Sequence, residues 1–137
     1  MNRPDSAYKV PTTLKDFFKN WLLFLRPFHG LSGKQLQLAA ALLEVRYQLG
    51  KKITDDELLD ANVLSTDVKR KIRESLGITV SNFQMTLGDL RKHGFIQNNR
   101  FNAKYIPNLK ENPTNYSLLL YFPIEAVEDE RAGEKGI

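Results

Sequence analysis

The side chains of this 137-residue chain that are most able to do chemistry are basic, and they gather in residues 69–110. This stretch holds nine Lys/Arg against two acids, a local charge of +7, so the rest of the chain sums to −3 against a net +4. Charge concentrated in this way is typical of a surface that binds a polyanion. The residues predicted to contact phosphates are Lys69, Arg70, Lys71, Arg73, Arg91, Lys92, Arg100 and Lys104.

A second group of polar side chains lies between the basic clusters, on a predicted helix over residues 80–93. If Phe83, Leu87 and Leu90 face the core, the turn of about 100° per residue directs other side chains of this helix outward. Asn and Gln can make paired hydrogen bonds to adenine, and Ser can contact any base. We therefore predict that this face contacts base edges. Its predicted base-reading residues are Ser81, Asn82, Gln84 and Met85.

Asp89 does not fit this polyanion-binding surface, because phosphates repel a carboxylate. It would need to accept a hydrogen bond from cytosine or pair with a neighbouring Arg or Lys.

Other chemistry has little support in the sequence. The chain has no cysteine, which excludes disulfides, thiolate metal sites and a cysteine nucleophile. His29 and His93 are the only histidines, and neither has a carboxylate at metal-ligand spacing. No serine lies in a nucleophile-elbow motif, and no glycine-rich loop could hold a phosphate. We therefore predict no catalytic residues, no metal site, no cofactor and no enzymatic activity.

Composition also indicates where the chain is found and how it is divided. The longest apolar run, residues 21–25, is far too short for a membrane span, and no signal peptide is recognisable. We expect no membrane partner and a cytoplasmic location, in the host cytoplasm, or a location in the virion if the chain is a phage structural component. Residues 1–12 are predicted to be a flexible arm, residues 13–124 a folded domain, and residues 125–137 an acidic disordered tail with five acids against two bases.

The domain is predicted to begin with an aromatic-rich helix that Thr12 or Thr13 caps and that ends near Pro27. Its core-facing seam, at helical spacing, is Leu14, Phe18, Trp21, Leu25 and Phe28. One flat contact would not bury the apolar residues outside that seam. We predict that they pack deep in the same domain or form an interface with a second copy or a larger protein partner. The interface candidates are Phe17, Leu22 and Phe24.

The remaining elements position the two polar groups. Helices are predicted from Ser32 to about Leu49, from Thr54 to about Ala61, and over residues 66–76 with Ser65 as N-cap. A tight turn at residues 77–78 then leads to the helix of residues 80–93, with Thr79 as N-cap. Strands are predicted over residues 95–97 and 100–106 around an Asn-Asn turn, and residues 116–122 as a strand buried on both faces. The expected fold is mainly α with a small antiparallel β wing.

Residues 72–96, IRESLGITVSNFQMTLGDLRKHGFI, resemble the winged helix-turn-helix of bacterial and phage regulators and replication initiators. The resemblance implies that a glycine turn leads into a recognition helix and that "LRKHGFI" leads into the wing. It also implies a winged helix-turn-helix fold with the aromatic-rich helix as an N-terminal extension. The chain departs from the pattern at Arg73, where a small residue is often found four positions before the turn glycine. The segments FLRPFHGLS and KRKIRESLGI also resemble small proteins of crAss-like and other large Bacteroidetes phages, which implies a phage origin.

Three functions are compatible with these patterns. The first is a DNA-binding regulator of transcription or replication, which binds double-stranded DNA as a dimer formed through its first helix. The second is a phage virion structural or assembly component that uses the same fold for protein docking. The third is an accessory factor that binds a polymerase. Fold alone does not decide among them, but Asn82 and Gln84 beside basic clusters favour DNA.

Overall fold

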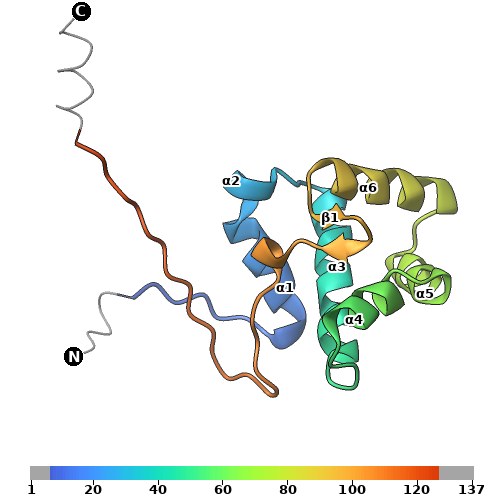
Figure 1. Cartoon of the computed structure of the whole chain (residues 1–137), viewed down its shortest axis with the longest axis horizontal. Coiled ribbons are helices and arrows are strands. Elements are labelled where there is room, and N and C mark those ends of the chain that lie inside the picture. The colour runs from blue at the N-terminus through green and yellow to red at the C-terminus, as the bar shows by residue number, and fades with distance from the viewer. Residues whose placement is uncertain (1–6, 127–137) are drawn as a thin grey trace, which may run out of the picture.

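The computed structural model of the chain describes residues 7–126, and it is mainly helical with one small antiparallel sheet, as predicted (Figure 1). The elements within this range are α1 (Leu14–Phe24), α2 (Arg26–His29), α3 (Lys34–Leu49), α4 (Asp56–Val63), α5 (Thr66–Leu76), α6 (Val80–Lys92), β1 (Ile96–Gln97), β2 (Arg100–Phe101) and the 3-10 helix η2 (Ala103–Tyr105). No helix in the part that the structure describes has the length and apolarity that a membrane span requires.

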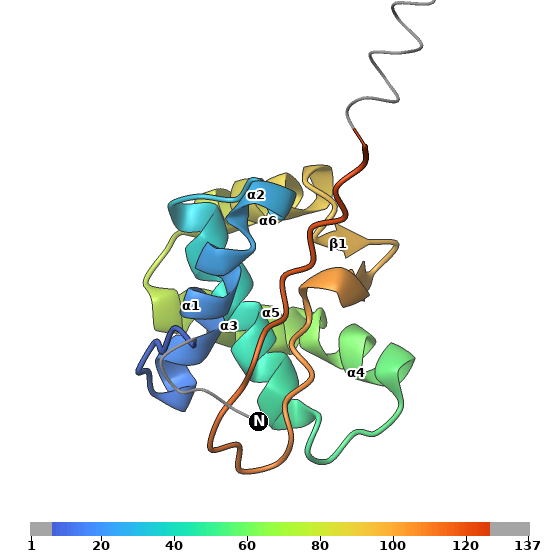
Figure 2. The ribbon, with the colours of Figure 1, turned by 90° about the vertical axis from the view of Figure 1, so that its left-hand side faces the viewer.

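Helix α3 runs through the centre of the fold and packs against α1, α4 and α6 (Figures 1 and 2). Its buried side chains are Leu36, Leu38, Ala39, Leu42 and Leu43. They are surrounded by the buried aromatics of α1, α6 and the hairpin, including Phe18, Phe83 and Phe95. Because α6 packs directly on α3, the position of its outward face is fixed by the core.

The first helical segment is two helices rather than one. Thr13 caps α1, as one of the two predicted candidates, because its side chain accepts a hydrogen bond from the Asp16 amide. The helix is interrupted at Leu25, because Pro27 has no N–H to donate to the carbonyl of Leu23. The indole of Trp21 donates to the backbone carbonyl of Tyr105 at 2.9 Å, and so joins α1 to the residues that follow the hairpin.

The predicted seam of the first helix is only partly buried. Phe18, Trp21 and Leu25 lie in the core, whereas Leu14 and Phe28 are exposed. Leu22, one of the three interface candidates, is fully buried and belongs to the core, so for this residue the alternative of packing within the same domain holds. The reason is its position one turn after Phe18, on the side of α1 that faces α3.

Local capping signals place most of the later helix ends. Ser65 caps α5 and Thr79 caps α6, as predicted. The predicted tight turn begins at Gly77, which ends α5 in the left-handed region with φ 67°. Helix α4 differs, since its N-cap is Asp55, whose carboxylate accepts from the Leu58 amide at 2.8 Å, and not Thr54. Gly33 occupies the cap position of α3, so this helix begins two residues after the predicted Ser32.

The hairpin forms around the predicted turn but is shorter than expected. Asn98 and Asn99 have φ of 52° and 60°, the left-handed conformation that a two-residue hairpin loop requires. Strand β2 ends at Phe101 rather than at Ile106. The Asn102 side chain accepts from the Lys104 amide at 3.1 Å and starts η2, because short polar side chains compete for backbone groups.

The predicted third strand, residues 116–122, is wrong. Residues 106–126 contain no helix or strand, and most side chains after Tyr116 are exposed. A continuous apolar run indicates burial but does not show which strand it would pair with. In the structure the hairpin does not pair with these residues. Residues 7–12 of the predicted arm form no helix or strand, and the rest of the predicted arm and almost all of the tail lie outside the described residues.

Candidate nucleic-acid interface

The outward face of α6 carries the four predicted base-reading residues. Ser81, Asn82, Gln84 and Met85 are all exposed, in the first half of the helix. The opposite face is buried through Phe83, Thr86, Leu87 and Leu90. The predicted division of this helix into a core face and an outward face is therefore present in the structure.

A cleft of about 260 Å³ lies between α5 and α6 and brings several predicted site residues together. Its walls are Thr66, Lys69, Arg70, Arg73, Val80, Phe83 and Gln84. Three of these are cations predicted to contact phosphates, and Gln84 is a predicted base-reading residue. A larger cleft of about 640 Å³ between α3, α4 and residues 103–111 contains none of the predicted site residues.

Two cations of the α5–α6 cleft also have contacts within the chain. Arg70 Nη2 lies 3.4 Å from an Asp67 carboxylate oxygen, and both side chains are largely exposed. Such a surface pair is weak and is readily exchanged for another anion. Arg73 Nη1 donates to the Ile78 carbonyl at 3.2 Å and so holds the turn between α5 and α6. Arg73, which stands where the winged-helix pattern that the sequence resembles often has a small residue, therefore has a structural use.

The C-terminal end of α6 carries Arg91 and Lys92, which are exposed and form no ion pair with any of the described residues. Asp89 precedes them and was expected either to accept a hydrogen bond from cytosine or to pair with a neighbouring Arg or Lys. Its carboxylate instead accepts a hydrogen bond from the side-chain amide of Gln35, on α3, at 3.2 Å. This contact turns part of its negative charge toward α3.

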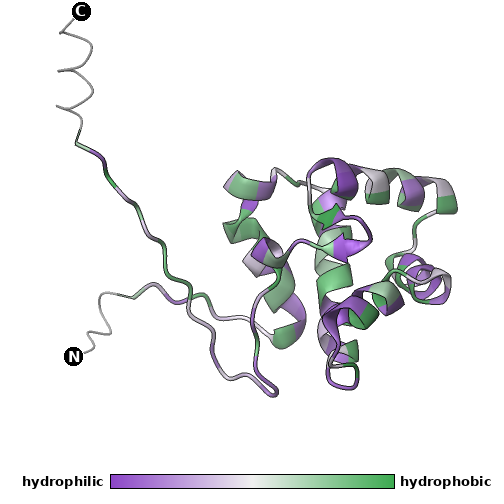
Figure 3. Ribbon diagram, viewed as in Figure 1, coloured by the Kyte–Doolittle hydropathy of each residue, from purple (hydrophilic) through white to green (hydrophobic). Residues whose placement is uncertain are grey.

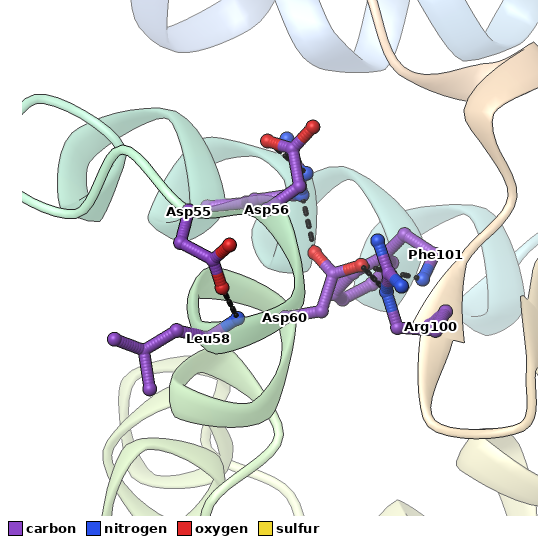
Figure 4. Close-up of polar contacts among 7 residues, drawn as sticks. Asp55, Asp56, Leu58, Asp60, Arg100 and Phe101 are labelled. Atoms are coloured by element: carbon purple, nitrogen blue, oxygen red, sulfur yellow. Dashed lines mark hydrogen bonds and ion pairs between the residues drawn. The ribbon is translucent and has the colours of Figure 1, made fainter.

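Arg100, on β2, is held by a buried acid on α4. Asp60 is 1% exposed, and one of its oxygens accepts from Arg100 Nε at 2.9 Å and from the Phe101 amide at 3.2 Å (Figure 4). The other oxygen accepts from Arg46 Nε at 2.7 Å. The hydrogen bond to Asp60 raises the pKa of Arg100 above its ordinary value. Because only Nε is used, the terminal nitrogens of this half-exposed side chain stay available to an anion.

Lys71 and Lys104 are exposed, on α5 and η2, but neither lines the α5–α6 cleft. Asp60, Arg46 and Gln35 were not among the residues predicted from the sequence. Asp60 follows Leu59 in an acidic segment, and a solvent-exposed acid would have the same sequence neighbours. Only its contact with Arg100, 40 residues later, distinguishes this buried acid from a solvated one.

In comparisons with protein-family models, with curated proteins and with solved structures, nothing was found to match this chain.

Proposed function

We propose that this chain is a DNA-binding protein of the winged-helix type that regulates transcription or replication. The observation that carries the proposal is the α5–α6 cleft, where Lys69, Arg70 and Arg73 lie beside Gln84 at the edge of the outward face of α6. Cations that contact phosphates set the position of a protein on the duplex, and adjacent amides then contact base edges.

The roles of the residues follow from their positions. Helix α6 is the proposed recognition helix, with Asn82 and Gln84 bonding to adenine and Ser81 and Met85 contacting neighbouring bases. The cleft cations on α5 would hold the phosphate backbone on one side of α6, and Arg91 and Lys92 would hold it at the C-terminal end. The hairpin takes the place of a wing, with Arg100 presented by Asp60 and Lys104 just beyond it.

The alternative of a virion or assembly component that docks proteins also has a specific observation in its favour. The residues that follow Tyr116 expose a large apolar surface. Contact with DNA does not require such a surface, because DNA interfaces are polar and positively charged. A docking protein with no DNA affinity would use this segment and leave the α5–α6 cleft empty.

Fluorescence anisotropy with a random-sequence duplex at two salt concentrations tests the proposal. We expect binding at low salt that weakens steeply as salt rises, with a log–log slope of roughly −0.9 per phosphate contact. Replacing Arg70 by Ala should make the slope shallower by about one. The matched control is Lys52→Ala, which removes an equal charge from an exposed position outside the cleft and α6. If no duplex affinity were measurable at low salt, the DNA-binding proposal would be wrong and the docking alternative would be favoured.

A further inference from the structure

The larger of the two clefts described above, of about 640 Å³, is here called the α3–α4 cleft. Two of its walls are α3 and the chain from Gly50 into α4, and the third is residues 103–111, which run beside α3 in both ribbon views (Figures 1 and 2). The Tyr47 hydroxyl, on α3, donates to the Lys110 carbonyl at 3.1 Å and so holds this third wall. A cleft of this volume is large enough for a small-molecule ligand.

The deepest part of the α3–α4 cleft is apolar. Phe18, Leu43 and Leu59 line it and are buried members of the hydrophobic core. Ile53 and Ile106 add half-buried aliphatic side chains that pack against the core. Figure 3 shows apolar and polar residues side by side on α3 and α4, the helices of the first two walls. The apolar part of a ligand would be stabilised here because it would leave water.

Arg46 is the least exposed of the charged side chains that line the cleft, at 13%. Its Nε donates to the buried Asp60 at 2.7 Å. No described residue accepts a hydrogen bond from Nη1 or Nη2, and the Asp56 oxygen that pairs with Nη2 is 3.6 Å away. Every buried side-chain nitrogen and oxygen of the described residues has a hydrogen-bond partner, so these two nitrogens are not buried but accessible.

The accessible nitrogens of Arg46 suit a carboxylate. A guanidinium binds a carboxylate through two parallel hydrogen bonds from two of its nitrogens. Arg46 could form these bonds with Nη1 and Nη2 while Nε keeps its hydrogen bond to Asp60. Asp56 is a weak competitor, because its side chain is 75% exposed and such surface pairs contribute little.

The other charged groups that line the α3–α4 cleft are exposed. They are one base, Lys51, and two acids, Asp56 and Glu111. Lys51 Nζ lies over the ring of Tyr47, 5.2 Å from its centroid. The two acids would repel a second negative charge, so the cleft favours a ligand with one carboxylate over a dianion such as a phosphate ester.

We propose that the α3–α4 cleft binds a small monocarboxylic acid with an aromatic or branched aliphatic body. The carboxylate pairs with the terminal nitrogens of Arg46, and the body lies on the apolar part of the cleft. Asp60 holds Arg46 and Arg100 together, so the ligand would join the hydrogen-bond network that fixes the hairpin to α4. The inference does not depend on DNA binding.

Isothermal titration calorimetry of the full chain with phenylacetate, indole-3-acetate and 4-methylpentanoate is the first test. We expect saturable binding of at least one acid, in the micromolar to millimolar range that suits ligands of this size. The amide of that acid has the same shape without the charge, and acetate lacks the apolar body. Each should bind at least tenfold more weakly. If none of the three acids bound, or if acid and amide bound equally, the proposal would be overturned.

Substitutions then locate the bound acid. Asp56→Asn removes the competing carboxylate from an exposed position, so the dissociation constant should fall at least threefold. The matched control is Glu57→Gln, at an exposed acid of α4 that does not line the cleft, which should change the constant less than twofold. Arg46→Lys keeps a positive charge beside Asp60 but loses the paired donors, so the constant should rise at least tenfold. An unchanged constant in either cleft variant would overturn the proposal, and Asp56→Asn decides alone if Arg46→Lys does not fold.

Discussion

The carboxylate of Asp60, buried on α4, accepts a hydrogen bond from Nε of Arg100, on β2, at 2.9 Å. The same carboxylate also accepts from the Phe101 amide and from Arg46. A buried carboxylate needs such partners, because an unpaired charge in the interior is strongly unfavourable. One side chain thus fixes the hairpin to α4 and sets the direction of Arg100.

Asp60→Ala is expected to lower the free energy of unfolding by roughly 3–5 kcal/mol, because Arg46 would lose its buried partner. Urea denaturation measures the change. Asp56→Ala is the matched control: Asp56 also pairs with Arg46, at 3.6 Å, but it is well exposed. Its loss should lower stability by less than about 1 kcal/mol. Equal effects of the two substitutions would contradict the role assigned to Asp60.

Leu22 and Leu23 form an adjacent pair with opposite environments, 0% and 45% exposed. Leu22→Ala should destabilise the chain by about 2–5 kcal/mol, because it leaves a cavity between α1 and α3. Leu23→Ala should change stability by less than about 1 kcal/mol. Thermal and urea unfolding distinguish the two. If Leu22→Ala were as mild as Leu23→Ala, α1 would not be packed on α3.

His29 makes stability depend on pH. Its ring accepts from the Leu31 amide at Nδ1, at 2.8 Å, so the proton is on Nε2, which donates to the Leu22 carbonyl at 2.7 Å. Burial lowers the pKa of His29 below its ordinary value of 6.5. Well above pH 6.5, His29 is neutral in both the folded and the unfolded chain, and its contribution to stability is fully present. As pH falls further, the unfolded chain takes up the proton first, so stability falls by up to about 1.4 kcal/mol per unit.

Urea denaturation between pH 5 and 8 tests this dependence. His29→Gln should be less stable at pH 7.5 yet lose less stability on acidification. An unchanged slope in His29→Gln would show that another group is responsible.

Base recognition is tested on α6. Asn82→Ala and Gln84→Ala should each reduce discrimination at one or two base pairs by about 1–3 kcal/mol without changing the salt slope. Asn62→Ala, at an exposed asparagine on α4, is the control and should leave site preference unaltered. Selection from a random duplex library provides the measurement. If both α6 variants kept the wild-type preference, the outward face of α6 would not contact bases.

Local signals in the sequence were sufficient for the helices around the candidate site. Ser65 and Thr79 cap the helices that they were predicted to cap, and the Asn98-Asn99 pair adopts the turn that its conformational tolerance indicated. Each of these depends on groups a few residues apart. The burial of Leu87 and Leu90 followed in the same way from helical periodicity.

Features that depend on distant residues were not predictable. From the sequence, Asp60 resembles a surface acid, and only the structure shows that Arg46 and Arg100 lie beside it. Residues 116–122 have the composition of a buried strand, but only the fold reveals that no strand pairs with them. For Leu22 the sequence left core and interface open, because periodicity locates one seam, whereas α3 covers α1 over a wider arc.

The hydrogen bond from Trp21 to the Tyr105 carbonyl joins residues 84 positions apart, one before and one after helices α5 and α6. This hydrogen bond therefore connects the two ends of the segment from Trp21 to Tyr105. Residues 66–92 are therefore not a unit that recombination or design could move into another protein by itself. Moved alone, α6 would lose the cover that α3 gives to its apolar side, so the smallest portable unit extends from α1 to η2.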